Sequence, residues 1–112
     1  MDLLSCRDRW GRTIVLTDRA WSHILDDHGE MAGNEWAIDL AVRQPDYVMD
    51  DASVDGRLVY YRGNVLPKPF DASFVKVCVE LLPPDETGNV VGEIVTAYAT
   101  PSLKRGERQR WP

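Results

Sequence analysis

A long run of alternating side chains near the C-terminus constrains the fold of this chain most strongly. From residue 74 to residue 82, valine or leucine at every second position alternates with polar or small side chains. That is the period of a strand with one face against a core. Residues 83–89 are rich in turn-forming types and lead into a second strand-like run at 90–99. These two runs predict a long antiparallel hairpin.

Two helices are expected before this hairpin. A short β-branched run at 13–16 is followed by Thr17, a suitable N-cap for a helix from about Asp18 to His28. Apolar residues at helical spacing continue from about Asn34 to Gln44, where Pro45 ends a second helix.

The hydrophobic period changes from 3.6 to 2 after the second helix, with strand candidates at 47–50 and 58–62. Together with the hairpin they give four strands. The sequence therefore predicts an α+β fold, with two N-terminal helices packed on a four-stranded antiparallel sheet. One extra short strand at the N-terminal side is a further candidate. The 112 residues fit a single domain, for which we expect a core at about residues 12–106 and a basic C-terminal tail at 104–112.

The charge is distributed unevenly along the chain. Residues 1–103 carry 9 basic and 17 acidic side chains, whereas residues 104–110 carry 4 basic and 1 acidic. Affinity for a phosphate backbone comes mainly from Lys and Arg. Any contact with nucleic acid is therefore expected at the C-terminal corner. The acidic surface of the other residues is expected to face solvent or to bind a basic protein partner.

Both histidines lie on the first expected helix, and they differ in direction. At 100° per residue, His28 shares a face with Trp21 and Ile24, while His23 points nearly the opposite way. His28 is therefore expected on the sheet-facing side, at the last turn of the helix.

The two cysteines, Cys6 and Cys78, are far apart and neither belongs to a CxxC pair. They predict free thiols, and we expect neither a metal site nor a cofactor. The N-terminus has no basic region followed by an apolar run, and no stretch of about 18 apolar residues occurs. We therefore expect a soluble, cytoplasmic protein with no membrane segment.

Several short motifs follow one another in a fixed order. They are Ile14-Val15-Leu16-Thr17, the run from Trp21 to Met31, Gln44-Pro45-Asp46, Val59-Tyr60-Tyr61-Arg62, Ile94-Val95-Thr96-Ala97-Tyr98 and Lys104-Arg105-Gly106. Their order resembles the phage and polymorphic-toxin nucleases grouped with barnase, EndoU, colicin-type tRNases and RelE-type toxins. The resemblance implies a metal-independent endoribonuclease domain of a toxin or phage effector, in some cases delivered into a target cell within a larger protein. Its implied partners are RNA (tRNA, mRNA or rRNA) and a cognate antitoxin or immunity protein.

Metal-independent RNA cleavage begins with attack of the ribose 2′-OH on the adjacent phosphate and leaves a 2′,3′-cyclic phosphate. It needs a base, an acid and groups that stabilise charge on the phosphorus centre. Carried over by the resemblance, His28 is expected to transfer protons, and Thr96 and Tyr98 share one face of a strand because they are two residues apart. The expected catalytic residues are His28, Thr96, Tyr98 and Lys104, and the expected substrate-binding residues are Tyr61, Arg62 and Arg105.

A second interpretation places the chain in another functional class. The pI of about 4.9 and the lack of a broad basic surface are unusual for a ribonuclease. They fit a non-catalytic binding module of the same fold, such as a phage accessory or structural domain or an acidic antitoxin-like protein. Both interpretations stay open at the level of the sequence.

Overall fold

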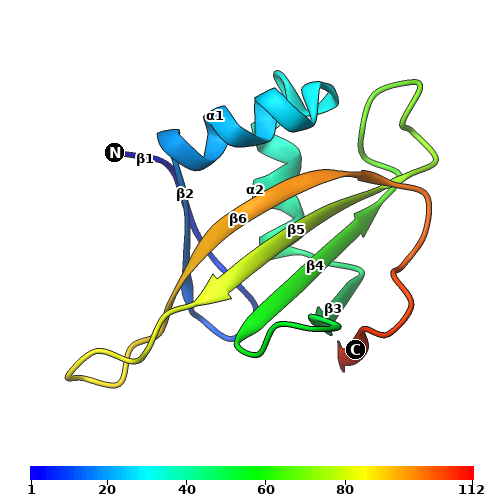
Figure 1. The fold of residues 1–112 in the computed structure, drawn as a ribbon. Helices are drawn as coiled ribbons and strands as arrows, with labels where there is room; N and C mark the ends of the chain where they lie inside the picture. The colour runs from blue at the N-terminus through cyan, green and yellow to red at the C-terminus, as the bar shows by residue number, and fades with distance from the viewer.

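Seven strands form one curved, mixed sheet, in the order β1-β2-β6-β5-β4-β3-β7 (Figure 1). The computed structural model describes all of residues 1–112. Two α-helices and one short 3-10 helix complete the fold. The strands are β1 (Asp2–Arg7), β2 (Thr13–Thr17), β3 (Tyr47–Asp50), β4 (Arg57–Gly63), β5 (Phe74–Leu81), β6 (Val91–Thr100) and β7 (Arg108–Trp111), and the helices are α1 (Asp18–Asp27), η1 (Gly29–Met31) and α2 (Glu35–Arg43).

The expectation of a four-stranded antiparallel sheet is wrong. The four expected strands occur as β3, β4, β5 and β6, which are antiparallel neighbours. The sheet also includes β1, β2 and β7, and β2 pairs with β6 in parallel through Thr13–Val91 and Val15–Glu93. Strands β1 and β7 have polar, weakly alternating sequences, so their positions depend on partners distant in the chain rather than on local pattern.

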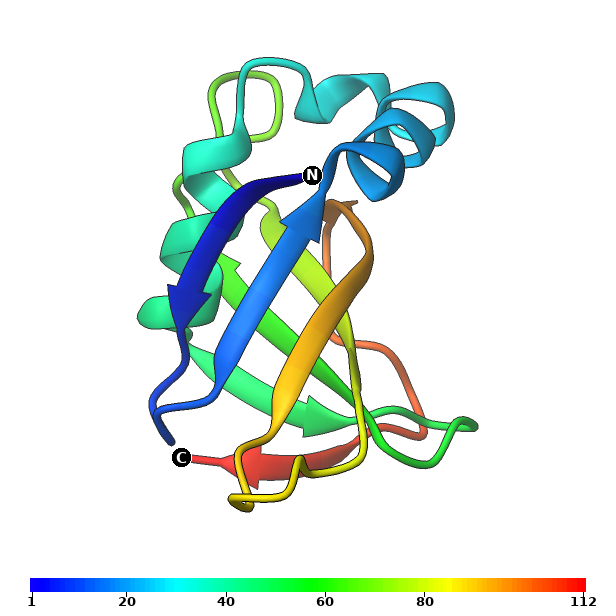
Figure 2. The same ribbon diagram turned by 90° about the vertical axis from the view of Figure 1, so that its left-hand side faces the viewer.

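The helices and the inner face of the sheet enclose the main core (Figure 2). Helix α1 begins where the Thr17 hydroxyl accepts a hydrogen bond from the Ala20 amide at 3.1 Å, which confirms the expected N-cap. It ends at Asp27, with His28 as its C-cap. Helix α2 covers the sheet with one apolar stripe, which consists of Ala37, Ile38, Ala41 and Val42.

A buried carboxylate in the turn between β1 and β2 connects this turn to β4. Asp8 is 5% exposed and accepts hydrogen bonds from the Arg12 guanidinium and from the Tyr60 hydroxyl, both at 2.7 Å. Burial and this bond to Asp8 raise the pKa of Tyr60 far above its ordinary value. The phenol therefore stays neutral and donates to the carboxylate. This network connects the β1–β2 turn to β4, at the opposite end of β2 from α1.

The expected basic tail is not a free end. Residues 108–111 form β7, which pairs with β3, and Arg110 binds the Asp50 carboxylate at 2.8 Å. Before β7, Leu103 packs on a small apolar cluster on the outer face of the sheet, and this cluster contains Met49, Val59, Tyr61 and Cys78. We call residues 101–111 the C-terminal segment. Neither α-helix has the length and apolar character that crossing a membrane would require.

Candidate functional site

The register of the sheet places three side chains in one row on its outer face. Tyr61 on β4 pairs with Lys76 on β5, and Lys76 pairs with Tyr98 on β6. Directly opposed residues of antiparallel strands point to the same face. The next row on that face includes Cys78 and Thr96, which also pair. Tyr98 and Thr96 therefore lie side by side, as the alternation along the strand predicts.

The end of α1 brings His28 to this row. The His28 ring stacks on Tyr98, with ring centroids 4.7 Å apart and planes 25° from parallel. Two residues further on, in η1, the Glu30 carboxylate accepts a hydrogen bond from the Ala99 amide at 3.1 Å, which fixes η1 to β6. Two expected site residues that are 70 positions apart in the chain therefore meet.

A buried ion pair lies beside the stacked rings. The Lys76 ammonium is 3.1 Å from a Glu107 carboxylate oxygen, and the two side chains are only 5% and 1% exposed. The same ammonium is 5.7 Å from the ring centroid of Tyr98 and 5.4 Å from that of Tyr61. Such distances allow cation–π attraction to both rings. We call His28, Thr96, Tyr98 and Lys76 the β6 site.

Hydrogen bonds complete this arrangement on the side of β4. The Tyr61 hydroxyl donates to the second carboxylate oxygen of Glu107 and accepts from the Lys104 amide at 3.3 Å. Burial and the bond to Glu107 raise the pKa of Tyr61 to about 12. Burial alone would lower the pKa of Lys76, but the Tyr61 hydroxyl and the Glu107 carboxylate outweigh it and raise that pKa above its ordinary value. Lys76 is therefore a permanent cation and Tyr61 a neutral donor near neutral pH.

Three other expected site residues lie outside this cluster. Arg62 follows Tyr61 on β4, so it points to the opposite face, where it donates to the Gln44 carbonyl at 2.8 Å. Lys104 and Arg105 have exposed side chains, and Lys104 reaches the cluster only through its backbone amide. Their predicted roles therefore have no support from the packing of the β6 site.

The sequence did not single out Lys76 or Glu107. Lys76 occupies an ordinary polar position in the alternation of its strand, and Glu107 is the one acid among the C-terminal cations. Only the pairing of β5 with β4 and β6, and the path of the C-terminal segment, reveal that both are buried. A useful signal would have been Phe74 and Cys78, the apolar residues two positions before and after Lys76, because they share its face of the strand.

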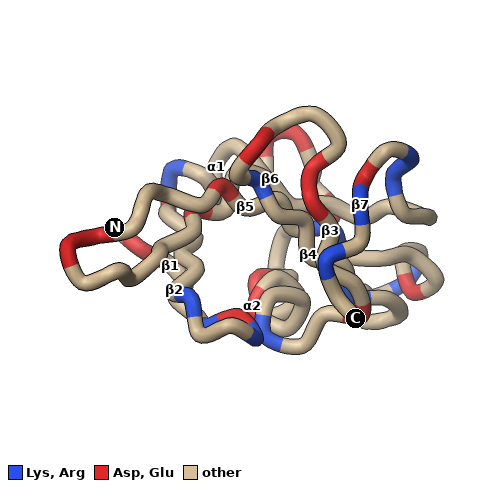
Figure 3. The backbone as a smooth tube through the Cα atoms, turned by 90° about the horizontal axis from the view of Figure 1, so that it is seen from below, with Lys and Arg blue, Asp and Glu red and all other residues tan.

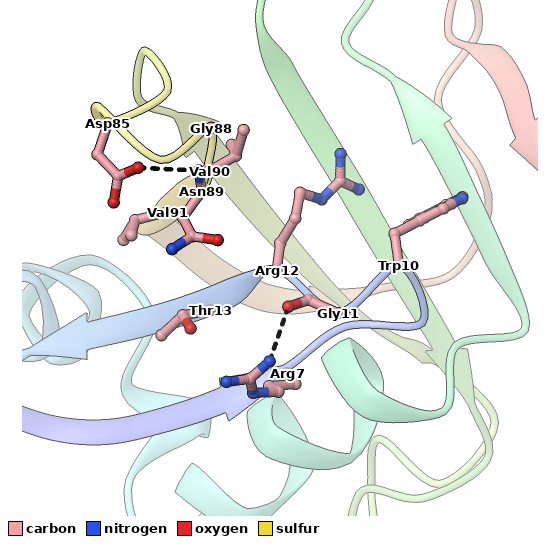
Figure 4. Close-up of a pocket in the computed structure, with 10 residues that line it drawn as sticks. All are labelled: Arg7, Trp10, Gly11, Arg12, Thr13, Asp85, Gly88, Asn89, Val90 and Val91. Carbon is pink, nitrogen blue, oxygen red and sulfur yellow. Dashed lines mark hydrogen bonds between the residues drawn. The ribbon is translucent and has the colours of Figure 1, made fainter.

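Two hollows in the surface flank the N-terminal half of β6. One, of about 360 Å³, lies between the β1–β2 turn and the β5–β6 loop, and polar side chains such as Arg7, Arg12 and Asn89 line it (Figure 4). The other, of about 520 Å³, lies between α1 and β6, where His23 and Val95 contribute to its lining. None of the four residues of the β6 site lines the second hollow. No group of three or more His, Cys, Asp or Glu side chains is arranged to hold a metal ion.

Comparison with models of known protein families, with curated proteins and with solved structures found no match.

Proposed function

We propose that this protein is an endoribonuclease that cleaves RNA without a metal ion, by attack of the 2′-OH and formation of a 2′,3′-cyclic phosphate. One observation carries the proposal. The imidazole of His28 stacks on Tyr98 at 4.7 Å, beside Thr96 and a buried Lys76 ammonium. An imidazole, two hydroxyls and a fixed cation are the groups that this reaction requires.

Each member of the β6 site has a distinct role in this proposal. His28 accepts the proton of the attacking 2′-OH and returns it to the 5′ oxygen as the P–O5′ bond breaks, because an imidazole is the side chain that exchanges protons most readily near neutral pH. Tyr98 holds the ring in place by stacking, and the Thr96 hydroxyl donates to a phosphate oxygen. Lys76 supplies the positive charge that the phosphorane needs.

The distribution of charge limits where RNA would lie. In Figure 3, Lys and Arg mark the loop before β7 and β7 itself, with an acidic residue between them. Lys104 and Arg105 are exposed there, and they follow directly after the chain leaves β6. We infer that these two residues contact the RNA backbone outside the β6 site. The order of the motifs supports a toxin or phage effector that acts on tRNA, mRNA or rRNA and is neutralised by a cognate inhibitor protein.

The direct test is cleavage of purified tRNA and mRNA in the presence of EDTA. His28→Ala should lower the rate by about 10²–10⁴-fold, the usual contribution of a proton-transferring side chain. His23→Ala is the matched control, because His23 lies on the same helix but is exposed and outside the stacked pair. Equal rates for the two variants, or no cleavage by the wild-type protein, would contradict the proposal.

A non-catalytic binding module is the second candidate. The negative net charge of residues 26–55, which hold nine acids and one arginine, favours this candidate. So does Glu107, because it already forms an ion pair with the Lys76 ammonium. Expression of wild-type protein and of His28→Ala in bacteria separates the two candidates. Equal growth of both cultures would favour the binding module, whereas growth arrest by the wild-type protein alone would favour the nuclease.

A further inference from the structure

The Glu107 carboxylate is held as a ligand would be held. One of its oxygens faces the Lys76 ammonium at 3.1 Å, and the other accepts from the Tyr61 hydroxyl. Both donors belong to the rigid centre of the sheet, on adjacent strands. The acceptor comes from the C-terminal segment, which reaches this face only after leaving β6.

This pair is not needed to fill space in the core. A buried ion pair is seldom more stable than apolar side chains of the same volume, because both charges lose their hydration. Val59 and Cys78 on the same face show that small apolar residues suit this environment. Stability alone therefore does not explain why a lysine and a tyrosine both bind one carboxylate here.

We propose that Lys76 and Tyr61 form a binding site for a phosphate-type oxyanion, which Glu107 fills in this conformation as an internal competitor. A phosphate or a phosphodiester presents two unesterified oxygens that can take the places of the two carboxylate oxygens. The anion would lie beside Tyr98, the ring on which His28 stacks. The link to RNA rests on the proposed function, whereas the binding of an oxyanion does not.

The C-terminal segment is built so that Glu107 can withdraw. Leu103 packs on the outer face and Trp111 on the main core, so the two ends of the segment are anchored. Between them, Lys104 and Arg105 are exposed, and Gly106 adopts a φ of +95°, which favours glycine. The ladder between β7 and β3 covers four residues of β7 and contains a register shift. Between the two anchors, the side-chain hydrogen bonds and ion pairs of residues 104–107 to the sheet are those made with Tyr61 and Lys76.

Calorimetric titration with inorganic phosphate tests this inference. Glu107→Ala should bind phosphate at least about tenfold more tightly than the wild-type protein, because the competitor is gone, and adding Lys76→Met should abolish the gain. Should Glu107→Ala fail to fold, Glu107→Gln keeps the volume, removes the competing charge and should shift the affinity in the same direction. Equal phosphate binding by the wild-type protein and the folded Glu107 variant, or a gain that survives Lys76→Met, would overturn the inference.

A second titration identifies the source of the oxyanion. A short 2′-O-methyl RNA cannot be cleaved, so it reports binding alone. If this oligonucleotide gains more affinity from Glu107→Ala than phosphate does, the site takes phosphodiesters, and the reverse order assigns it to free phosphate. Neither titration depends on turnover. Absence of ribonuclease activity from the wild-type protein and from the Glu107 variant, with the phosphate gain intact, would refute the proposed function and leave this site standing.

Discussion

Replacing Lys76 with methionine should lower the free energy of unfolding by about 3–5 kcal/mol. The change removes the cation and leaves the Glu107 carboxylate buried without its partner, since that side chain is only 1% exposed. Breaking one half of a buried ion pair costs this much because the remaining charge has lost its water. A domain of this size has only about 5–15 kcal/mol of stability, so the loss would be easy to measure.

The size of this loss of stability depends on how deeply the ion pair is buried and not on the distance between its charged atoms. Arg43 and Asp39 form a shorter pair, 2.6 Å apart, but their side chains are 52% and 22% exposed. Arg43→Met should therefore cost no more than about 1 kcal/mol, because solvent screens the pair. Replacing both Lys76 and Glu107 with methionine should restore most of the loss, since no charge is then left buried.

Urea unfolding followed by tryptophan fluorescence gives the free energies of unfolding of five proteins, which are the wild type, Lys76→Met, Glu107→Met, the double variant and Arg43→Met. A cycle over the wild type, both single variants and the double variant isolates the coupling between the two charges. If Lys76→Met loses no more stability than Arg43→Met, then the Glu107 carboxylate does not stay buried without its partner, and the argument from burial is refuted.

Three further predictions concern the scaffold. Gly92→Ala should cost about 1–3 kcal/mol in urea unfolding, because its new Cβ would lie 2.6 and 2.7 Å from side-chain carbons of β5 and β2, whereas Gly29→Ala, with no atom within 4 Å, should avoid this clash penalty. Thr17→Ala removes the cap of α1 and should cost about 1 kcal/mol by the same measurement; an unchanged stability would show that the cap is dispensable. Burial raises the pKa of Cys6 to about 12 and that of Cys78 above its ordinary value, so both thiols should resist alkylation at pH 8 until the protein unfolds. Because the pKa values of both thiols are higher in the folded protein than in the unfolded chain, the free energy of unfolding should fall as the pH rises from about 9 towards 12. A free energy of unfolding that stays constant over that window would contradict the burial of the thiols.

Local pattern was sufficient for the central elements of the fold. The alternation in β5, the cap at Thr17 and the helical stripe of α2 each depend on neighbours within one element. Strand β7 could not be found in this way, because its exposed residues and its charges are typical of a solvated tail. The parallel pairing of β2 with β6 likewise depends on a long-range contact that no local period encodes.

The sequence likewise predicted only some of the side chains of the candidate site. Helical phasing selected His28 over His23, and strand alternation placed Thr96 with Tyr98; in the structure His28 stacks on Tyr98, and Thr96 and Tyr98 lie on one face of β6. The Lys76–Glu107 pair depends on the path of the C-terminal segment across the outer face, so the sequence alone could not show it. Arg62 was expected to bind substrate from a neighbouring strand, but the sequence did not show that it points away from the β6 site, since a single step along a strand reverses the face.

The central claim is that the stacked imidazole of the β6 site cleaves RNA. Its most direct test is to identify the products that the wild-type protein and His28→Ala form from tRNA or mRNA in EDTA. We expect fragments ending in 2′,3′-cyclic phosphate from the wild-type protein, and at least about 100-fold less from the variant. Absence of such fragments with the wild-type protein, or an equal yield from the two proteins, would contradict the claim.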